Sequence, residues 1–169
     1  MLAYLKNVFM AVAPVFACGP AIVAADGIQG TFAIQNVATG MNLRPFDASK
    51  QDRNRVILYN HHAWKCLTWE FLPIEGNSYR LKNYYTAKAV EPAAHAVGPT
   101  TLQQRPISGG VTQIWEFVDQ PVNAFLIRHK TTGLYITASS HLRDSELHLQ
   151  PRDRTRPQSW RLIRQRPWF

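Results

Sequence analysis

Cys66 is the strongest candidate nucleophile in the sequence, and two imidazoles, His61 and His62, lie a few positions before it. A thiol beside an imidazole base is the arrangement of a covalent catalyst, but it also needs a third group that orients the base. The sequence supplies no such group, and Cys66 lies two residues from a segment expected in the core. These residues therefore do not predict a thiol enzyme.

Metal and phosphate chemistry also lack a supporting pattern. The six histidines are scattered, and Cys66 accompanies them without metal-ligand spacing. Adjacent residues such as His61 and His62 would point to opposite faces of a strand. The sequence has no glycine-rich phosphate loop and no motif of paired carboxylates. We therefore predict a binding protein that is not an enzyme and that uses no metal or cofactor.

Arginines gather at the C-terminal end, where residues 152–169 contain six arginines against one acid, Asp153. The guanidinium fork binds sulfate, sialate or phosphate groups through paired hydrogen bonds. Arg152, Arg154 and Arg156 are thus candidate ligands for an anionic glycan. A solvated strand end followed by a terminal tail has the same composition, so both interpretations stay open.

Several aromatic side chains fall in segments expected to be loops. His61, His62 and Trp64 form one group, and Tyr84 and Tyr85 form another. Exposed aromatic rings either cap a barrel or form a recognition patch. For the first group the two alternatives are equal, and for the tyrosine pair the recognition patch is favoured.

A repeat of about 46 residues must position these side chains. One aromatic series, spaced 47 and 46 residues apart, is Phe32, Tyr79 and Phe125. A second series, spaced 46 and 45 residues apart, is Trp69, Trp115 and Trp160. Each repeat, at about 30–72, 77–118 and 123–163, contains four short segments that read as half-buried strands. Three four-stranded repeats predict an all-β, barrel-like fold.

The ends of repeats two and three carry the motif Gln-x-Trp, as Gln113-Ile114-Trp115 and Gln158-Ser159-Trp160. Together with the turn-and-strand segments, these motifs resemble the ricin B-type β-trefoil lectins over roughly residues 30–163. The first repeat departs from the pattern, because Leu67 stands where the glutamine is expected. The resemblance implies a β-trefoil over residues 26–169, with the tryptophans in its core.

The resemblance also implies sugar pockets, each with an acid after the turn strand. That position holds Arg44, Glu91 and Thr137 in the three repeats, so only repeat two keeps a carboxylate, and repeat one is not expected to bind neutral sugars. No aromatic ring falls at the usual stacking place. The candidate sugar ligands are Glu91, Thr101, Gln103, Thr112 and Gln113 in repeat two, and Glu146, His148 and Gln158 in repeat three. The alternative is that Glu91 is simply a solvated acid.

A narrower resemblance concerns residues 123–151, which are similar to the third repeat of cytolethal distending toxin C subunits. The stretch 59–64 resembles the aromatic patch of the A subunits. Both subunit types are exported trefoils that bind host cells and escort a nuclease subunit. This chain lacks their disulfide cysteines and long flanking tails, which leaves the toxin assembly less supported than the trefoil.

The first 25 residues are typical of a signal peptide. Lys6 is the only charged side chain before Asp26, an apolar stretch follows it, and residues 23–25 offer a small-residue cleavage site. The stretch is too short and too interrupted for a transmembrane span. Cys18 faintly resembles a lipoprotein site, as a minority alternative. After cleavage Cys66 is the one remaining cysteine, so no internal disulfide is expected.

The chain has 169 residues and a net charge of +8, which fits one basic, exported domain. We expect a cell-surface glycan or glycoprotein as partner, with further toxin subunits, a nuclease among them, as additional partners. Nucleic acid fits the charge but not an exported protein. The alternative function is a protein-interaction trefoil, such as a protease inhibitor or an assembly scaffold, with no sugar binding.

Overall fold

A computed structural model describes residues 27–93, 100–121, 123–153 and 155–167. The predicted signal peptide (1–25), with Cys18, lies outside the described residues, as does Arg154. The first repeat contains β1 (Thr31–Asn36), β2 (Asn42–Pro45), η1 (Phe46–Ala48), β3 (Val56–Tyr59), η2 (Lys65–Leu67) and β4 (Trp69–Glu75). The second contains β5 (Ser78–Asn83), β6 (Ala89–Pro92), β7 (Leu102–Arg105), η3 (Val111–Gln113) and β8 (Trp115–Gln120). The third contains β9 (Ala124–His129), β10 (Tyr135–Thr137), β11 (His148–Gln150), η4 (Arg156–Gln158) and β12 (Ser159–Arg164).

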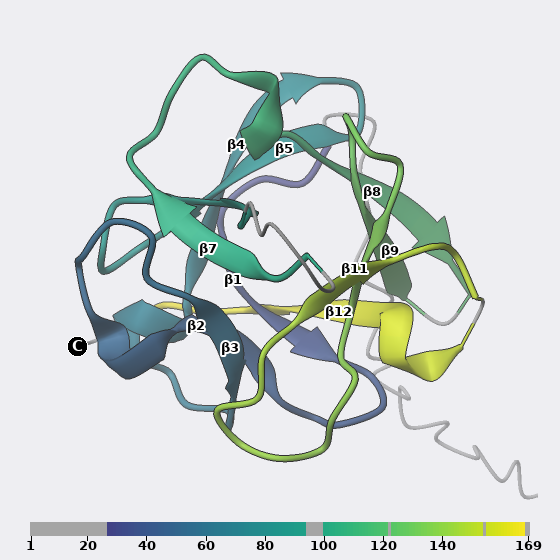
Figure 1. The fold of residues 1–169 in the computed structure, drawn as a ribbon, viewed down its shortest axis with the longest axis horizontal. Coiled ribbons are helices and arrows are strands. Elements are labelled where there is room, and N and C mark those ends of the chain that lie inside the picture. Colours follow the sequence, from purple (N-terminus) through teal and green to yellow (C-terminus); the bar gives the residue numbers. More distant parts are fainter. Residues whose placement is uncertain (1–26, 94–99, 122, 154, 168–169) are drawn as a thin grey trace, which may run out of the picture.

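The first and last strands of the repeats close into a barrel. The antiparallel pairs run β1–β4, β4–β5, β5–β8, β8–β9, β9–β12 and back through β12–β1. Closure pairs both edges of each of the six barrel strands, so none of these six is left open to pair with another chain. Figure 1 shows the repeats following one another around the molecule in colour order, with β12 returning beside β1.

The middle strands form three hairpins: β2–β3, β6–β7 and β10–β11. Single antiparallel bridges join them to one another, namely Arg55↔Gln103, Ile57↔Glu146 and Thr101↔His148. Each hairpin thus touches the other two, which produces the triangular cap of a β-trefoil. The predicted fold class, three four-stranded repeats, is confirmed.

The three tryptophans lie in the core, as the sequence predicts. Trp69, Trp115 and Trp160 are each 0% exposed, so all of their large apolar surface is removed from water. Each indole Nε1 donates to a main-chain oxygen of its own hairpin at 3.0 Å, on Leu43, Val90 and Ile136 respectively. The hydrogen bond satisfies the buried indole N–H and locks the hairpin onto the barrel.

A second set of buried polar residues, missed in the sequence, fixes the turns after β1, β5 and β9. The amides of Asn36 and Asn83 donate to main-chain oxygens of a neighbouring 3₁₀ segment, on Pro157 and Cys66, at 2.9 Å each. His129 takes the equivalent place, with its Nε2 3.0 Å from the Thr112 oxygen. These contacts hold each turn against a segment that precedes a core tryptophan.

Candidate functional site

The strand register places one residue of each repeat at the same point of its hairpin. Arg44 pairs with Ile57, Glu91 with Gln103, and Thr137 with His148. The alignment that the sequence predicts for the three acid positions is therefore present in the fold. A guanidinium, a carboxylate and a hydroxyl occupy equivalent sites, so the three repeats offer three different chemistries.

In repeat two the structure brings Glu91, Gln103 and Gln113 together. Gln103 Nε2 donates to Glu91 Oε1 at 3.2 Å, and Gln113 Nε2 donates to Glu91 Oε2 at 3.0 Å. Each carboxylate oxygen is thus held by one amide, and Glu91 stays half-buried on β6. An ionised carboxylate has about four acceptor positions, so about two remain for a ligand. No ion pair to Glu91 is found among the described residues.

The two motif glutamines lie behind the surface rather than on it. Gln113 is 1% exposed and Gln158 is 0% exposed. The Gln158 amide donates to Thr137 Oγ1 at 3.1 Å and to the Pro151 oxygen at 2.8 Å, and its oxygen accepts from the Asp153 N–H. This corrects the prediction that they touch the sugar: they shape the loops instead, and Gln113 also orients Glu91.

The other predicted ligands are dispersed. Thr101 is buried at the hairpin contact with His148, while Thr112 is exposed within η3. In repeat three Glu146 faces Arg55, with 3.6 Å between Oε1 and Nη1, so its charge is already partly balanced. The His148 Nδ1 lies 3.2 Å from the Ser139 hydroxyl. Repeat three thus lacks a free carboxylate held between two amides.

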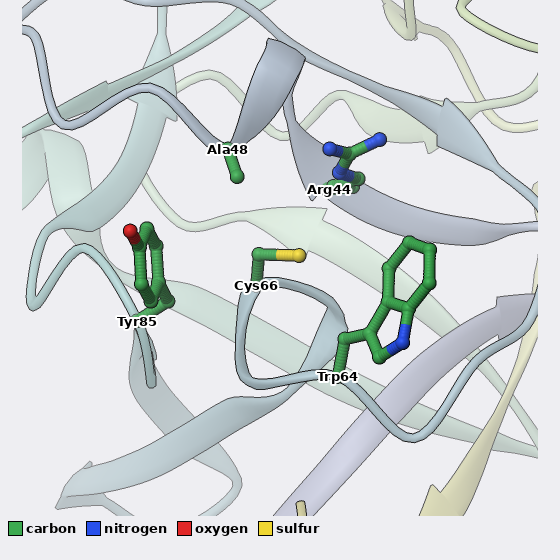
Figure 2. Close-up of a pocket in the computed structure, with 5 residues that line it drawn as sticks. All are labelled: Arg44, Ala48, Trp64, Cys66 and Tyr85. Carbon is green, nitrogen blue, oxygen red and sulfur yellow. The ribbon is translucent and has the colours of Figure 1, made fainter. Parts of the chain in front are cut away.

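Repeat one contains a pocket that the sequence analysis did not predict. Its volume is about 240 Å³, and Arg44, Ala48, Trp64, Cys66 and Tyr85 line it. Figure 2 shows these side chains arranged around a common space, with the Cys66 sulfur pointing into it. The sequence predicts no neutral-sugar site in this repeat, and the pocket does not test that prediction. What the search for carboxylates missed is an arginine in a pocket whose walls come from two repeats.

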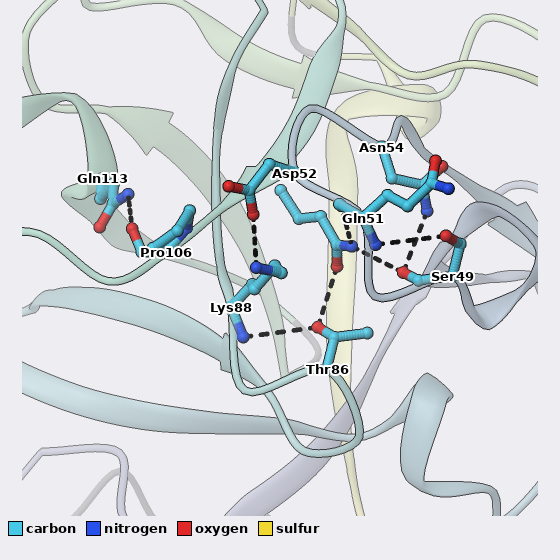
Figure 3. Close-up of polar contacts among 9 residues, drawn as sticks. Ser49, Gln51, Asp52, Asn54, Thr86, Lys88, Pro106 and Gln113 are labelled. Carbon is cyan, nitrogen blue, oxygen red and sulfur yellow. Dashed lines mark hydrogen bonds and ion pairs between the residues drawn. The ribbon is translucent and has the colours of Figure 1, made fainter.

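The rim of this pocket is tied to repeat two by Gln104, which is fully buried. Its Nε2 donates to the main-chain oxygens of Ser49 and Gln51 at 2.7 and 2.8 Å, and its Oε1 accepts from the Thr86 hydroxyl at 2.9 Å. Figure 3 shows this network, with the Lys88–Asp52 ion pair beside it. The loop after β2 is therefore held against the turn that carries Tyr85.

The predicted aromatic residues are divided between two environments. His62 stacks on Trp64 with ring centroids 4.2 Å apart, and Tyr59 lies 6.3 Å from both rings. His61 Nδ1 accepts from the Asn42 amide at 3.1 Å, as a neutral imidazole does. Desolvation lowers the pKa of His61, and the nearby His62 and Arg161 lower it further. Tyr84 and Tyr85 are 46% and 43% exposed.

The predicted arginine cluster has two described members, Arg152 and Arg156, and both are exposed. No ion pair to either is found in the part of the chain that the structure describes. Within the same residues no group of three or more metal-ligating side chains gathers at one place. Nor does any helix there have the length and apolar character needed to span a membrane.

A closed six-stranded barrel capped by three hairpins defines a β-trefoil. Solved structures agree. The designed threefold-symmetric protein ThreeFoil matches with a TM-score of 0.75 and 20% identity, over 79% of this chain and 98% of that chain. The ricin B-like lectin of Macrolepiota procera, solved with lactose, matches at 0.66 and 19%, over 80% and 96%. A chain of the Haemophilus ducreyi cytolethal distending toxin matches at 0.67 and 18%, over 97% and 96%.

At these identities the likeness establishes the fold. It confirms, at the level of the fold, the resemblance to ricin B-type trefoils and to the cytolethal distending toxin. No protein-family model and no curated protein sequence matches the chain.

Proposed function

We propose that this chain is an exported, non-catalytic lectin that binds a neutral sugar of a cell-surface glycan at repeat two. The observation that carries the proposal is the Glu91 carboxylate, whose two oxygens are held separately by Gln103 and Gln113. A carboxylate on a rigid hairpin with about two acceptor positions left suits a pair of neighbouring sugar hydroxyls.

The two amides have different tasks in this mechanism. Gln113 is buried and also donates to the Pro106 oxygen, so it fixes Glu91 from behind. Gln103 is half-buried, and its own amide oxygen adds an acceptor beside the carboxylate. Because the carboxylate is already oriented, sugar binding need not order it, which lowers the entropic cost of association.

The likeness to a chain of the Haemophilus ducreyi cytolethal distending toxin supports a narrower role. In this proposal the chain is the cell-binding subunit of a secreted toxin, and it acts with other subunits that include a nuclease. Single sugar pockets bind weakly, and an assembly that presents several of them gains avidity. Export is supported by residues 1–25, and N-terminal sequencing of secreted protein should then find Asp26 first.

The test is a printed array of neutral and acidic glycans, probed with the purified chain at physiological and at high salt. We expect a defined neutral glycan to bind and the signal to survive salt, because hydrogen bonds to hydroxyls are screened less than ion pairs. Glu91→Gln replaces one acceptor oxygen by a donor. A hydrogen bond to a charged group is worth about 1.5–3 kcal/mol, so affinity should fall at least about tenfold.

Glu146→Gln is the matched control, because it makes the same change in repeat three, where the carboxylate faces Arg55. This variant should keep its affinity for neutral sugar, and both variants should keep the thermal midpoint within a few degrees. Unchanged binding by Glu91→Gln would remove repeat two as the site. Silence of the whole array would reject the lectin and favour the protein-interaction alternative.

A further inference from the structure

The pocket of repeat one lies at the position where repeat two has its carboxylate. Arg44 pairs with Ile57 in the β2–β3 hairpin as Glu91 pairs with Gln103 in the β6–β7 hairpin. The charge at this point is therefore inverted between two repeats of the same fold. A carboxylate binds a hydroxyl that donates to it, whereas a guanidinium has only donors and makes its strongest hydrogen bonds to an anionic acceptor.

Arg44 is a half-buried cation, and part of its hydrogen-bonding capacity is unfilled. Its Nε has no hydrogen-bond partner and no contact with solvent. Its guanidinium carbon lies 4.1 Å from the centre of the Tyr59 ring, and no acidic side chain lines the pocket. Among the described residues no ion pair to Arg44 is found. A desolvated donor without a partner is costly, and an anion would remove that cost with charge-assisted hydrogen bonds.

The remaining walls are mostly apolar and come from separate parts of the chain. Trp64 and Cys66 lie before and within η2, while Tyr85 lies in the turn between β5 and β6. Stacking on His62, at an angle of 13° between the rings, fixes the plane of the Trp64 indole. Aromatic walls beside one charged group suit a ligand with an apolar face and one anionic substituent.

The size of the pocket limits the ligand. Its volume of about 240 Å³ lies below the range of roughly 300–1,000 Å³ that drug-sized molecules occupy. One sugar ring with its acidic substituent therefore suits it better than an extended chain.

The rim of the pocket stores backbone strain. Asp47 and Ala48 both have positive φ, at 50° and 51°, although neither is glycine. Such conformations cost about 1–3 kcal/mol each and persist only where the surroundings impose them. Here Gln104 holds the main chain of the loop from one side, and the Asn54 amide donates to the Phe46 oxygen at 2.9 Å. The strained pair places Ala48 in the pocket wall.

We propose that this pocket binds an acidic sugar, with its carboxylate or sulfate on the Arg44 guanidinium and its ring against Trp64 and Tyr85. The site is separate from the neutral-sugar site of repeat two, and it extends the proposed lectin function to a second ligand class. The two sites use different residues, so either can fail without the other.

The experiment measures binding and thiol protection together. The full chain with Cys18→Ser has one thiol, Cys66, which lines the pocket. The probes are the methyl α-glycoside of N-acetylneuraminic acid, its methyl ester, galactose 6-sulfate, galactose and inorganic sulfate, each titrated calorimetrically and then tested for slowing maleimide labelling. We expect one of the acidic sugars to bind at least about tenfold more tightly than its neutral counterpart and to slow Cys66 labelling. Which one does so separates the carboxylate source from the sulfate source.

Arg44→Met keeps the length and apolar stem of the side chain and removes the cation. It should weaken the acidic sugar at least about tenfold and leave neutral-sugar binding at Glu91 unchanged. Lys130→Met, which removes an exposed cation in the turn after β9, is the control and should have no effect. Tyr85→Leu alters an exposed wall without touching the cation, and it should weaken the acidic sugar while the fold persists.

Three results would overturn the proposal. The first is acidic-sugar affinity that survives both Arg44→Met and Tyr85→Leu. The second is saturating ligand that leaves Cys66 labelling unchanged. The third is inorganic sulfate binding and protecting as well as either sugar, since the apolar walls would then contribute nothing. Loss of neutral-sugar binding in Glu91→Gln with acidic binding intact would instead support both sites independently.

Discussion

Gln104 links the fold to the repeat-one pocket, and its replacement by methionine should lower both stability and pocket order. Methionine has nearly the same length and volume, so the change removes hydrogen bonds without leaving a large cavity. Three bonds are lost: two to the main-chain oxygens of Ser49 and Gln51 and one from the Thr86 hydroxyl. The side chain is 0% exposed, so water cannot replace them at that position.

Each such bond contributes about 1 kcal/mol net, so Gln104→Met should lower the free energy of unfolding by about 3 kcal/mol. Urea m-values for small proteins are about 1–3 kcal/mol/M, and the urea midpoint should therefore fall by about 1–3 M at an unchanged m-value. Because the Ser49–Gln51 stretch adjoins the pocket rim, maleimide should also label Cys66 faster in the Cys18→Ser background.

Gln103→Met is the matched control, since the neighbouring side chain is half-buried and donates one bond, to Glu91 at 3.2 Å. This variant should lose at most about 1 kcal/mol. Two results would refute the argument that Gln104 stabilises the loop after β2. One is an equal loss of unfolding free energy in the two variants, and the other is a loss below about 1 kcal/mol for Gln104→Met. Faster labelling of Cys66 in the Gln103→Met variant would refute the argument that Gln104 in particular orders the rim of the pocket.

Two further predictions concern the turns. Ala87 has a φ of 58°, and the equivalent residues of the other repeats are glycines, Gly40 at 70° and Gly133 at 72°. Because glycine adopts this left-handed conformation without strain, Ala87→Gly should raise the free energy of unfolding by about 0.5–1 kcal/mol. Gly40→Ala should lower it, and urea unfolding measures both changes. Burial lowers the pKa of His129 below 6.5, although the Thr112 main chain and the Glu91 charge oppose the shift. The unfolded chain then binds more protons below about pH 6.5, so stability falls as the pH drops through that window. His129→Asn should reduce this loss, measured by urea midpoints between about pH 7.5 and pH 5, and an unchanged pH dependence would assign the loss to other groups.

The barrel was predictable because its signals are periodic and carried by large residues. Trp69, Trp115 and Trp160 recur at nearly equal spacing, and a core needs such side chains at equivalent points of each repeat. The turn residues were missed because different residue types make the equivalent hydrogen bond in different repeats. Asn83 and His129 are different residue types that place a donor at equivalent main-chain oxygens, those of Cys66 and Thr112.

Of the two candidate sites, the one at Glu91 could be predicted from the sequence and the pocket at Arg44 could not. The Glu91–Gln103 contact follows from strand register, which the repeat spacing already implies. The pocket around Arg44 does not follow from it, because Tyr85 comes from the next repeat and Ala48 from a strained loop that no local propensity predicts. The motif glutamines misled the site prediction because a residue that recurs in a family-like motif can be buried as well as exposed, and sequence alone does not separate the two.

The three repeats share their core and differ at their pockets, and this difference bears on what the molecule can recognise. The indole-to-carbonyl bonds are 3.0 Å in all three, so the scaffold holds each hairpin in the same way. At the equivalent hairpin point stand Arg44, Glu91 and Thr137, of which the last already accepts a bond from a buried glutamine. A trefoil with three equal pockets would gain avidity for repeated copies of one sugar. From the two proposed sites, one cationic and one anionic, we instead expect a preference for glycans that carry an acidic and a neutral unit at the separation of the two hairpins, because only such a ligand would fill both sites at once.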